Sequence, residues 1–409
     1  MQYSRLAAVV FVFALARCAC ATAATDADYI ARFREERPAP GNPPPLKAYA
    51  TPERYDREFM GAALEEAFKA PSNDTGGLAW GLSKHLHSLN MMYSATGDVK
   101  YLEANRMCIR AVLGATDVKR GKKLWTGRTS AAWGCEKYAK ERGRAIFPVH
   151  TGIITAPMFQ FLVYAKEHDA YRGQLGEEYG VILRGALRAL AEHDRQWRDG
   201  PGPDEGHYVG MDQEPQLDER PLPGNRLSAM GWALYYAWKA SGDTAHRARA
   251  LAVGRYMKHR LTPTPEGAYF WPYRLPDDPV GGLAPRTSVS GEDTSHAGLS
   301  LRLMLELGRD GLVFAEKDMR RLANTVTQGF GRLGNGVLFG NITGTPESRP
   351  RYVNWTARWL ALAPWNPAVR PPILQFYLKH EPNPGPQDLA SLIRYGAPRG
   401  EELLDEVIE

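Results

Sequence analysis

Three titratable side chains stand together at the start of one apolar helix. Glu292, Asp293 and His296 occur within Ser-Gly-Glu-Asp-Thr-Ser-His, and an apolar run at 299–307 follows them. Asp293 is a good helix cap, and His296 follows Glu292 by one helical turn, so we expect these two side chains to share a face. A carboxylate beside an imidazole can hold the ring in orientation for proton transfer, although a structural ion pair would show the same spacing. The segment is therefore our first candidate for an active site, with Asp293 also placed to contact a ligand.

Aromatic side chains alternate along the segment that precedes this helix. Residues 267–274 read Gly-Ala-Tyr-Phe-Trp-Pro-Tyr-Arg, and in a strand Tyr269, Trp271 and Tyr273 would lie on one face. Arg274 follows at once, and arginine pairs bidentately with carboxylates. Because the apolar faces of sugar rings stack on aromatic rings, we expect this hairpin to bind an acidic saccharide.

The body of the chain alternates apolar helices with amphipathic ones about five times. The expected helices cover 51–70, 78–94, 99–113, 153–164, 176–197, 227–240, 244–259, 299–307, 316–330, 353–363, 374–379 and 387–394. Helices that are apolar all round are buried, and amphipathic helices are half exposed, so the alternation predicts two concentric layers. We expect an all-α fold, an α/α toroid in the form of an incomplete barrel of about five to seven helical hairpins with short β-hairpin loops. An open superhelical array of hairpins is the alternative.

Polar side chains recur where the inner helices of such a toroid would begin. In this architecture all inner helices start at the same end, with their positive dipole ends directed at one face. The residues that we expect to converge there are Trp80, His150, Asn225, Arg226, His296, Arg351, Tyr352, Asn354 and Trp355, and Arg128 of the insertion 124–147 would add to the wall. The convergence predicts a cleft for an anionic ligand.

Composition narrows the class of protein. The 409-residue chain has a formal net charge of +5, with its lysines and arginines dispersed. This excess suits an anionic small molecule or polysaccharide and is too weak to indicate nucleic acid. No phosphate-binding loop, dinucleotide fingerprint, serine-hydrolase elbow or zinc-ligand spacing occurs, so we expect neither a cofactor nor a metal.

The N-terminus has the features of an export signal. Arg5 is followed by an apolar stretch and small residues, which predicts a signal peptide at 1–24 and a periplasmic or secreted protein with no later membrane span. Residues 25–50 are Pro-rich and predict an extended arm, and 51–409 form a single toroid domain. Cys108 and Cys135 then remain, either as one disulfide or as two separate buried thiols.

The residues at the inner helix starts resemble those of the toroidal polysaccharide lyases, the alginate, glucuronan and chondroitin lyase type. The resemblance covers about 51–395 and implies β-elimination on a uronic-acid polysaccharide. It assigns carboxylate neutralisation to Asn225 and His296, with Glu292 orienting His296. Tyr352 would act as base and acid beside Arg351, with Tyr273 and Arg274 as the rival pair. The chain departs from the alginate-lyase pattern because Arg226, not a second Asn and a His, follows Asn225.

Other activities on the same toroid stay open. A glycoside hydrolase would use Glu292 or Asp293 as the general acid, with a second carboxylate such as Asp204 or Asp74 across the cleft. A non-catalytic glycan-binding protein would use the same cleft without proton transfer, and a C5-epimerase would share the lyase's proton abstraction.

Overall fold

The structure is a computed structural model that describes residues 24–39, 41–69, 71–139, 142–211 and 219–397. The predicted signal peptide at 1–24 lies almost wholly outside the described residues. Within them the chain is an all-α α/α toroid, as predicted.

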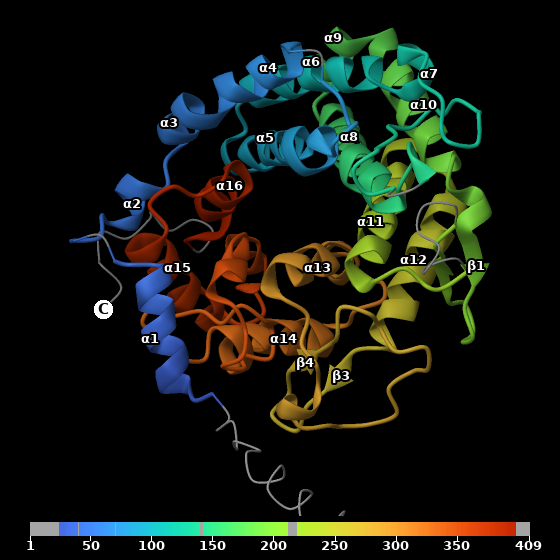
Figure 1. The fold of residues 1–409 in the computed structure, drawn as a ribbon. Helices are drawn as coiled ribbons and strands as arrows, with labels where there is room; N and C mark the ends of the chain where they lie inside the picture. The colour runs from blue at the N-terminus through green and yellow to red at the C-terminus, as the bar shows by residue number, and fades with distance from the viewer. Residues whose placement is uncertain (1–23, 40, 70, 140–141, 212–218, 398–409) are drawn as a thin grey trace, which may run out of the picture.

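Six inner segments form a ring in the described part of the chain. They are η2 (Leu78–Leu82) continuing into α5 (Ser83–Thr96), α8 (Pro148–Glu167), α11 (Gly224–Ser241), α13 (Thr294–Arg309), η9 (Thr356–Leu362) and α16 (Pro386–Tyr395). Each segment contacts the next, and α16 packs back on α5, so the ring closes. In Figure 1 the labelled inner helices surround a central opening.

The outer layer consists of the helices that connect the inner ones. These are α3 (Pro52–Tyr55), η1 (Asp56–Met60), α4 (Gly61–Phe68), α6 (Lys100–Gly114), α9 (Asp169–Leu175), α10 (Glu177–Ala191), α12 (Thr244–Lys258), α14 (Glu316–Thr325), η7 (Val326–Phe330) and α15 (Arg370–His380). Short single turns lie in the loops, at α7 (Asp117–Arg120), η4 (Asp194–Gln196), η6 (Arg286–Ser288), η8 (Pro350–Val353) and η10 (Pro367–Val369). Two small antiparallel hairpins complete the fold, β1 (Trp197–Asp199) with β2 (Gly206–Tyr208) and β3 (Thr262–Pro263) with β4 (Tyr269–Phe270).

Repeated local signals set the helix boundaries. Gly97 and Gly242 end α5 and α11 in the left-handed conformation, at φ of 73° and 80°, which glycine adopts without a Cβ penalty. The side chain of Asp243 then caps α12 by accepting from the Ala245 N–H. Asp293 caps α13 by accepting from the N–H groups of Ser295 and His296.

Close approach between inner helices depends on small residues. A Cβ at Gly152 of α8 would lie 2.6 Å from the backbone of Ala229 on α11, and one at Gly231 of α11 would lie 2.4 Å from Leu303 of α13. These separations are well inside van der Waals contact, so a larger residue at either glycine would force the neighbouring helices apart. The inner ring is therefore tight at its α8–α11–α13 side.

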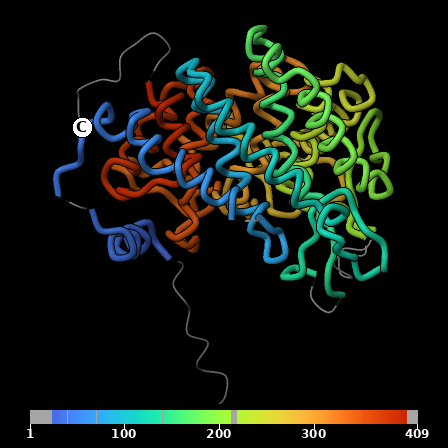
Figure 2. The backbone as a smooth tube through the Cα atoms, turned by 90° about the horizontal axis from the view of Figure 1, so that it is seen from above, coloured from blue at the N-terminus to red at the C-terminus, as the bar shows by residue number. Residues whose placement is uncertain are grey.

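The extended arm predicted for residues 25–50 is wrong. The segment forms α1 (Asp26–Glu36) and α2 (Leu46–Tyr49), and Figure 2 shows its blue trace beside the red C-terminal helices. Tyr29 and Phe33 are fully buried, and the Tyr29 hydroxyl donates to the Leu338 carbonyl at 2.7 Å. Their i, i+4 spacing puts both rings on one helix face, a signal that the neighbouring prolines obscured.

The two cysteines are separate buried thiols. The Cys108 thiol lies 3.6 Å from the Ala63 carbonyl, and the Cys135 thiol lies 3.4 Å from the Asp74 carbonyl. Burial raises the pKa of Cys108 to about 12. The disulfide alternative is therefore wrong, because α6 and the insertion loop hold the two sulfurs in different surroundings.

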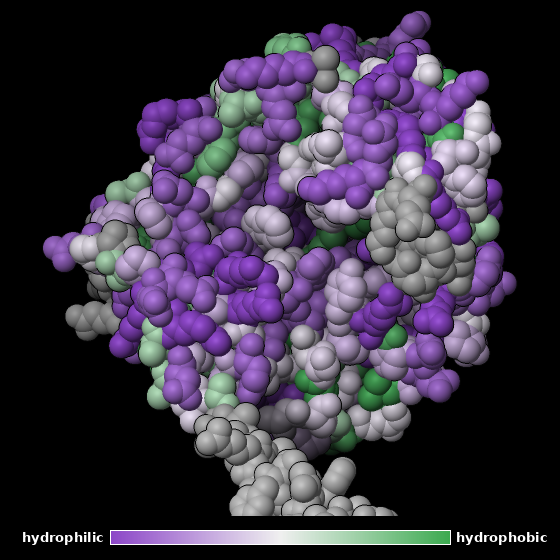
Figure 3. Space-filling view, viewed as in Figure 1, coloured by the Kyte–Doolittle hydropathy of each residue, from purple (hydrophilic) through white to green (hydrophobic). Residues whose placement is uncertain are grey.

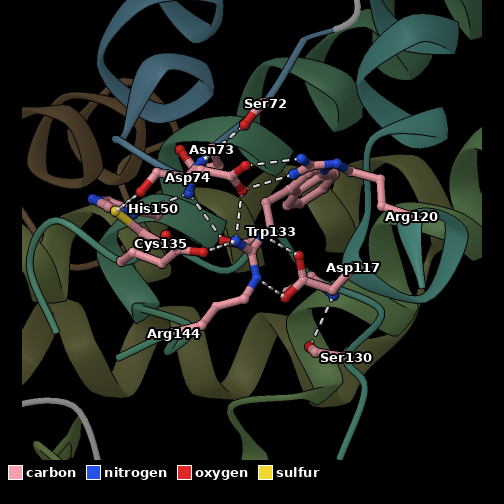
Figure 4. Close-up of polar contacts among 12 residues, drawn as sticks. Ser72, Asn73, Asp74, Asp117, Arg120, Ser130, Trp133, Cys135, Arg144 and His150 are labelled. Carbon is pink, nitrogen blue, oxygen red and sulfur yellow. Dashed lines mark hydrogen bonds and ion pairs between the residues drawn. The ribbon is translucent and has the colours of Figure 1, made fainter. Parts of the chain in front are cut away.

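An ion-pair cluster fastens the insertion 124–147 to the start of η2 (Figure 4). Arg120 makes two bonds of 2.8 Å to Asp74, and Arg144 bonds both Asp74 and Asp117. The Arg120 guanidinium, together with Arg144, holds the pKa of Asp74 well below its usual range although burial opposes this. We call Asp74, Asp117, Arg120 and Arg144 the paired cluster.

Candidate functional site

The inner ring encloses one large pocket with a volume of about 420 Å³. Figure 3 shows a hollow at the centre of the molecule on the face drawn there. Every inner segment contributes to the lining, which consists of Ala79, Trp80, Ser83, Lys84, His87, Tyr138, Phe147, Val149, His150, Ile153, Asn225, Arg226, Trp232, Tyr273, Ser295, His296, Leu299, Arg302, Trp355, Arg358 and Gln387. Aromatic and cationic side chains dominate this wall.

The starts of the inner segments do converge on this pocket. Seven of the predicted site residues line it, and these are Trp80, His150, Asn225, Arg226, Tyr273, His296 and Trp355. They come from six different places in the chain, and the toroid brings them together because its inner segments run in the same direction. Their roles in binding or catalysis remain predictions.

His296 is the pocket residue best placed for proton transfer. Its side chain is 43% exposed, and its Nδ1 lies 2.5 Å from Asp293 Oδ2. Although burial alone would raise it, hydrogen bonds from His296 and Ser295 lower the pKa of Asp293. An ionised carboxylate only accepts, so Nδ1 donates and Nε2 is left outside this bond. The ring of Tyr273 packs edge-on against His296 at 5.2 Å.

His150 has the opposite character. It is buried, its Nδ1 lies 3.2 Å from the Asn73 amide nitrogen, and the Trp80 ring meets it edge-on at 5.5 Å. Burial, with the positive charge of Arg226 nearby, lowers the pKa of His150 to about 3. His150 is therefore a neutral wall residue at physiological pH.

Two buried arginines line the pocket, and the sequence analysis missed both. Arg302 lies on α13, 8% exposed, and Arg358 lies on η9, 7% exposed. Burial, reinforced by the charge of Arg358, lowers the pKa of Arg302 to about 9. An arginine inside the apolar run Leu301-Arg302-Leu303 is the signal that could have found it, because an unpaired charge is rare on a buried helix.

His87 and Lys84 of α5 also line the pocket. Arg302 donates to His87 Nε2 at 3.3 Å, and burial lowers the pKa of His87 well below its usual value, so this ring is neutral. The Lys84 ammonium stands over the Trp355 ring at 4.3 Å. Lys84 and His87 continue the helical stripe begun by Trp80, and this spacing was the available signal for both.

The lining has a strong charge asymmetry. Four cationic side chains contribute to it, Lys84, Arg226, Arg302 and Arg358, whereas no carboxylate does among the residues placed by the structure. Within the same residues no group of three or more His, Cys, Asp or Glu side chains could hold a metal ion. No helix in the described ranges is both long enough and apolar enough for a transmembrane span.

The aromatic hairpin contributes less than predicted. Tyr269 and Trp271 are buried in the wall of the fold, where the Tyr269 hydroxyl donates to Asp318 and the Trp271 indole donates to Glu292. Arg274 is exposed outside the pocket lining. Strand pairing in β3–β4 ends at Phe270, so the expected alternation does not continue and only Tyr273 reaches the pocket.

Glu292 does not orient His296. It is 1% exposed and accepts from the Trp271 indole at 2.6 Å and from Ser300 at 2.8 Å. Burial raises the pKa of Glu292 well above its usual value. The residue precedes the helix and points into the core, whereas Asp293, as the cap, stands over the first turn and takes the role expected of Glu292.

The predicted Tyr352 group lies outside the pocket lining. Arg351 donates to the Tyr352 hydroxyl at 3.3 Å near the surface, and Asn354 accepts from Arg37 of the N-terminal segment at 2.6 Å. Arg128 lies in a separate small hollow, where it pairs with Glu192 at 2.6 Å. The turn η8 carries Tyr352 away from the ring's axis before Trp355, and this irregular geometry was invisible to helical periodicity.

The two proposed partner carboxylates are also elsewhere. Asp74 belongs to the paired cluster, and Asp204 is an exposed turn residue at φ 56° whose carbonyl accepts from Arg255. Neither lines the pocket. A carboxylate pair across the cleft is therefore not formed by the predicted residues.

Comparisons with known proteins give similarities at the level of fold. No family model and no curated protein matches the chain. Among solved structures, the GH76A α-1,6-mannanase of Salegentibacter sp. HEL1_6 shares 12% identity over 82% of this chain and 97% of its own, with a TM-score of 0.45. An inactive variant of that enzyme in complex with α-1,6-mannotriose gives the same values, and one with α-1,6-mannotetrose gives 11%, 82%, 96% and 0.42.

These similar folds belong to glycoside hydrolases and not to uronate lyases. The predicted resemblance to alginate, glucuronan and chondroitin lyases is therefore wrong, and so is the prediction of a lyase that cleaves by β-elimination. The site agrees with the correction, since Tyr352 and Arg351 lie outside the pocket and Glu292 is turned away from it.

Proposed function

We propose that the protein is an exported glycoside hydrolase that binds an acidic saccharide in the central pocket. The observation that carries the proposal is the Asp293–His296 pair, half exposed at the wall of a pocket lined by aromatic rings. Trp80, Tyr273 and Trp355 offer apolar faces to sugar rings. The proposal rests on the pocket and not on the similar solved structures, whose likeness is of fold alone.

His296 is the proposed proton acceptor. With Nδ1 donating to Asp293, Nε2 takes the proton of the water that attacks the anomeric carbon, and Asp293 stabilises the imidazolium that forms. Tyr273, packed against the same imidazole, is the proposed donor to the departing oxygen. The cationic side chains of the lining favour a substrate that carries negative charge.

The test is incubation with a panel of saccharides while two signals are followed. Alginate, glucuronan, hyaluronan, chondroitin and heparosan form the acidic panel, and an α-1,6-mannan is the neutral comparison. New reducing ends without a rise in ultraviolet absorbance support hydrolysis. An absorbance rise reports an unsaturated product and contradicts it.

A matched variant pair tests the role of His296. His296→Ala should lower kcat by about 10²–10⁴-fold while the melting temperature stays close to that of the wild type. His246→Ala is the control, because His246 follows its own helix cap, Asp243, at the same i, i+3 spacing on outer helix α12. Equal turnover in the two variants would remove His296 from the mechanism.

A non-catalytic glycan-binding protein is the second candidate. It is favoured by the absence of a carboxylate from the described pocket lining, because most glycoside hydrolases use a pair of carboxylates. Calorimetric binding of an acidic oligosaccharide, with no product in either assay, would select this function over hydrolysis.

A further inference from the structure

We propose that Arg302 and Arg358 form an anion subsite in the central pocket, which holds one carboxylate or sulfate group of the saccharide. The inference deepens the proposed function and rests on it only for the identity of the ligand as a saccharide. We call Arg302, Arg358 and His87 the anion subsite.

Neither guanidinium is neutralised by the protein. Arg302 donates to the neutral His87 and stacks near Trp232 at 5.5 Å, while Arg358 donates to the Gln387 side chain at 3.1 Å. No carboxylate of the described chain lies within ion-pair distance of either group. Burying a cation without a partner costs several kcal/mol in effective free energy, so a site that keeps two of them is arranged for an external anion.

Unpaired hydrogen-bond donors gather on the same wall. Among the pocket-lining side chains, buried donors without a partner are Trp80 Nε1, His87 Nδ1, Trp232 Nε1, Arg302 Nη2 and Arg358 Nε. His87 accepts from Arg302 at Nε2, so its Nδ1 carries hydrogen and is a donor. Buried polar atoms are normally paired, and a wall of donors is complementary to an oxyanion, which only accepts.

The subsite is separated from His296 along α13. Arg302 follows His296 by six residues, which corresponds to a rise of about 9 Å. A single carboxylate or sulfate group cannot span that distance. The acidic group and the bond at His296 therefore belong to neighbouring parts of one substrate, and the pocket selects a saccharide whose charge is displaced from the scissile bond.

Calorimetry with small anions tests the subsite without requiring turnover. The probes are methyl glucuronide, sodium sulfate and, as the neutral comparison, methyl glucoside, at low ionic strength because screening weakens such contacts. We expect the wild type to bind at least one anionic probe and to bind methyl glucoside more weakly. The preferred probe identifies the group as a carboxylate or as a sulfate ester.

Substitutions place the binding at the two arginines. Arg302→Gln and Arg358→Gln should each weaken the anion by about 10- to 100-fold, and Arg302→Lys should recover part of the loss because it keeps the charge without the planar fork. Arg320→Gln removes the same charge from the exposed face of α14 and should have no effect. His296→Ala should also leave the affinity unchanged, since it lies at the other part of the pocket.

The inference is overturned if neither anion binds the wild type, or if Arg302→Gln, Arg302→Lys and Arg358→Gln all bind as the wild type does. Failure of hydrolysis is a separate outcome: no reducing ends with anion binding intact would refute the proposed enzyme and keep the subsite. Turnover of acidic saccharides with no effect of the two arginines would do the reverse.

Discussion

The paired cluster and the anion subsite contain the same kind of side chain in opposite circumstances. In the paired cluster, Arg144 is 6% exposed and bonds two carboxylates, one of which, Asp117, is fully buried. In the anion subsite, Arg302 is equally buried and bonds only a neutral histidine. A buried arginine with its carboxylates stabilises the fold, and a buried arginine without them is prepared for a ligand.

The largest expected effect breaks the paired cluster. Arg144→Gln leaves Asp117 buried without its partner, and we expect the free energy of unfolding to fall by about 3–5 kcal/mol. Denaturant titration with a constant m-value measures the change. Arg128→Gln, which removes a surface partner of Glu192, should cost at most about 1 kcal/mol. Similar losses in both variants would mean that burial does not distinguish the two ion pairs.

Acid should reveal a second, smaller difference, which lies in histidines near the pocket wall. Burial lowers the pKa of His193 to about 4, and its Nε2 lies 2.8 Å from the Thr151 hydroxyl of α8. Below pH 6.5 the unfolded chain binds a proton that the folded chain refuses, so stability falls as pH falls from 6.5 towards 4. At pH 5 this group contributes a loss of about 2 kcal/mol.

The His193 contribution can be isolated by comparing stability at pH 5 and pH 7.5. His193→Gln should reduce the loss between the two pH values, while His246→Gln, on the half-exposed outer helix, should change it less. The paired cluster should contribute little in this range, because arginines hold the pKa of Asp74 far below it. An unchanged pH slope in His193→Gln would contradict the neutral assignment.

The smallest expected effect sharpens the comparison by its sign. Arg302→Gln in anion-free buffer should leave the free energy of unfolding unchanged or raise it by about 1 kcal/mol, because it removes a desolvated charge that has no partner. The same replacement at Arg144 is strongly destabilising. A loss at Arg302 as large as that at Arg144 would show that the arginine is paired within the fold.

Periodicity was sufficient to predict the architecture. Apolar helices such as 227–240 and amphipathic helices such as 244–259 differ in composition because one is surrounded by protein and the other by water on one side. The same logic predicted that inner helices begin at one end, and it brought His150, Asn225 and His296 to one pocket. These signals are local and survive without knowledge of the tertiary contacts.

The parts that failed depend on geometry finer than a helical turn. Glu292 and Asp293 are adjacent, yet one enters the core and the other caps α13 beside His296, and only the backbone path decides between them. The displacement of Tyr352 follows from the turn η8 and the left-handed Trp355, at φ 64°. Arg302 was missed for a different reason, since a charged residue in an apolar run was not examined as a site.

The docking of the first helices on the last ones has a consequence for the time course of folding. The bond from Tyr29 to Leu338 joins residues 309 positions apart, and α5 cannot meet α16 until Tyr395 has been made. Contacts of such long sequence separation slow folding because the loop must close before they form. During synthesis Tyr29 and Phe33 therefore lack their docking surface until the end of the chain emerges, and we expect the nascent toroid to depend on chaperones until the ring shuts.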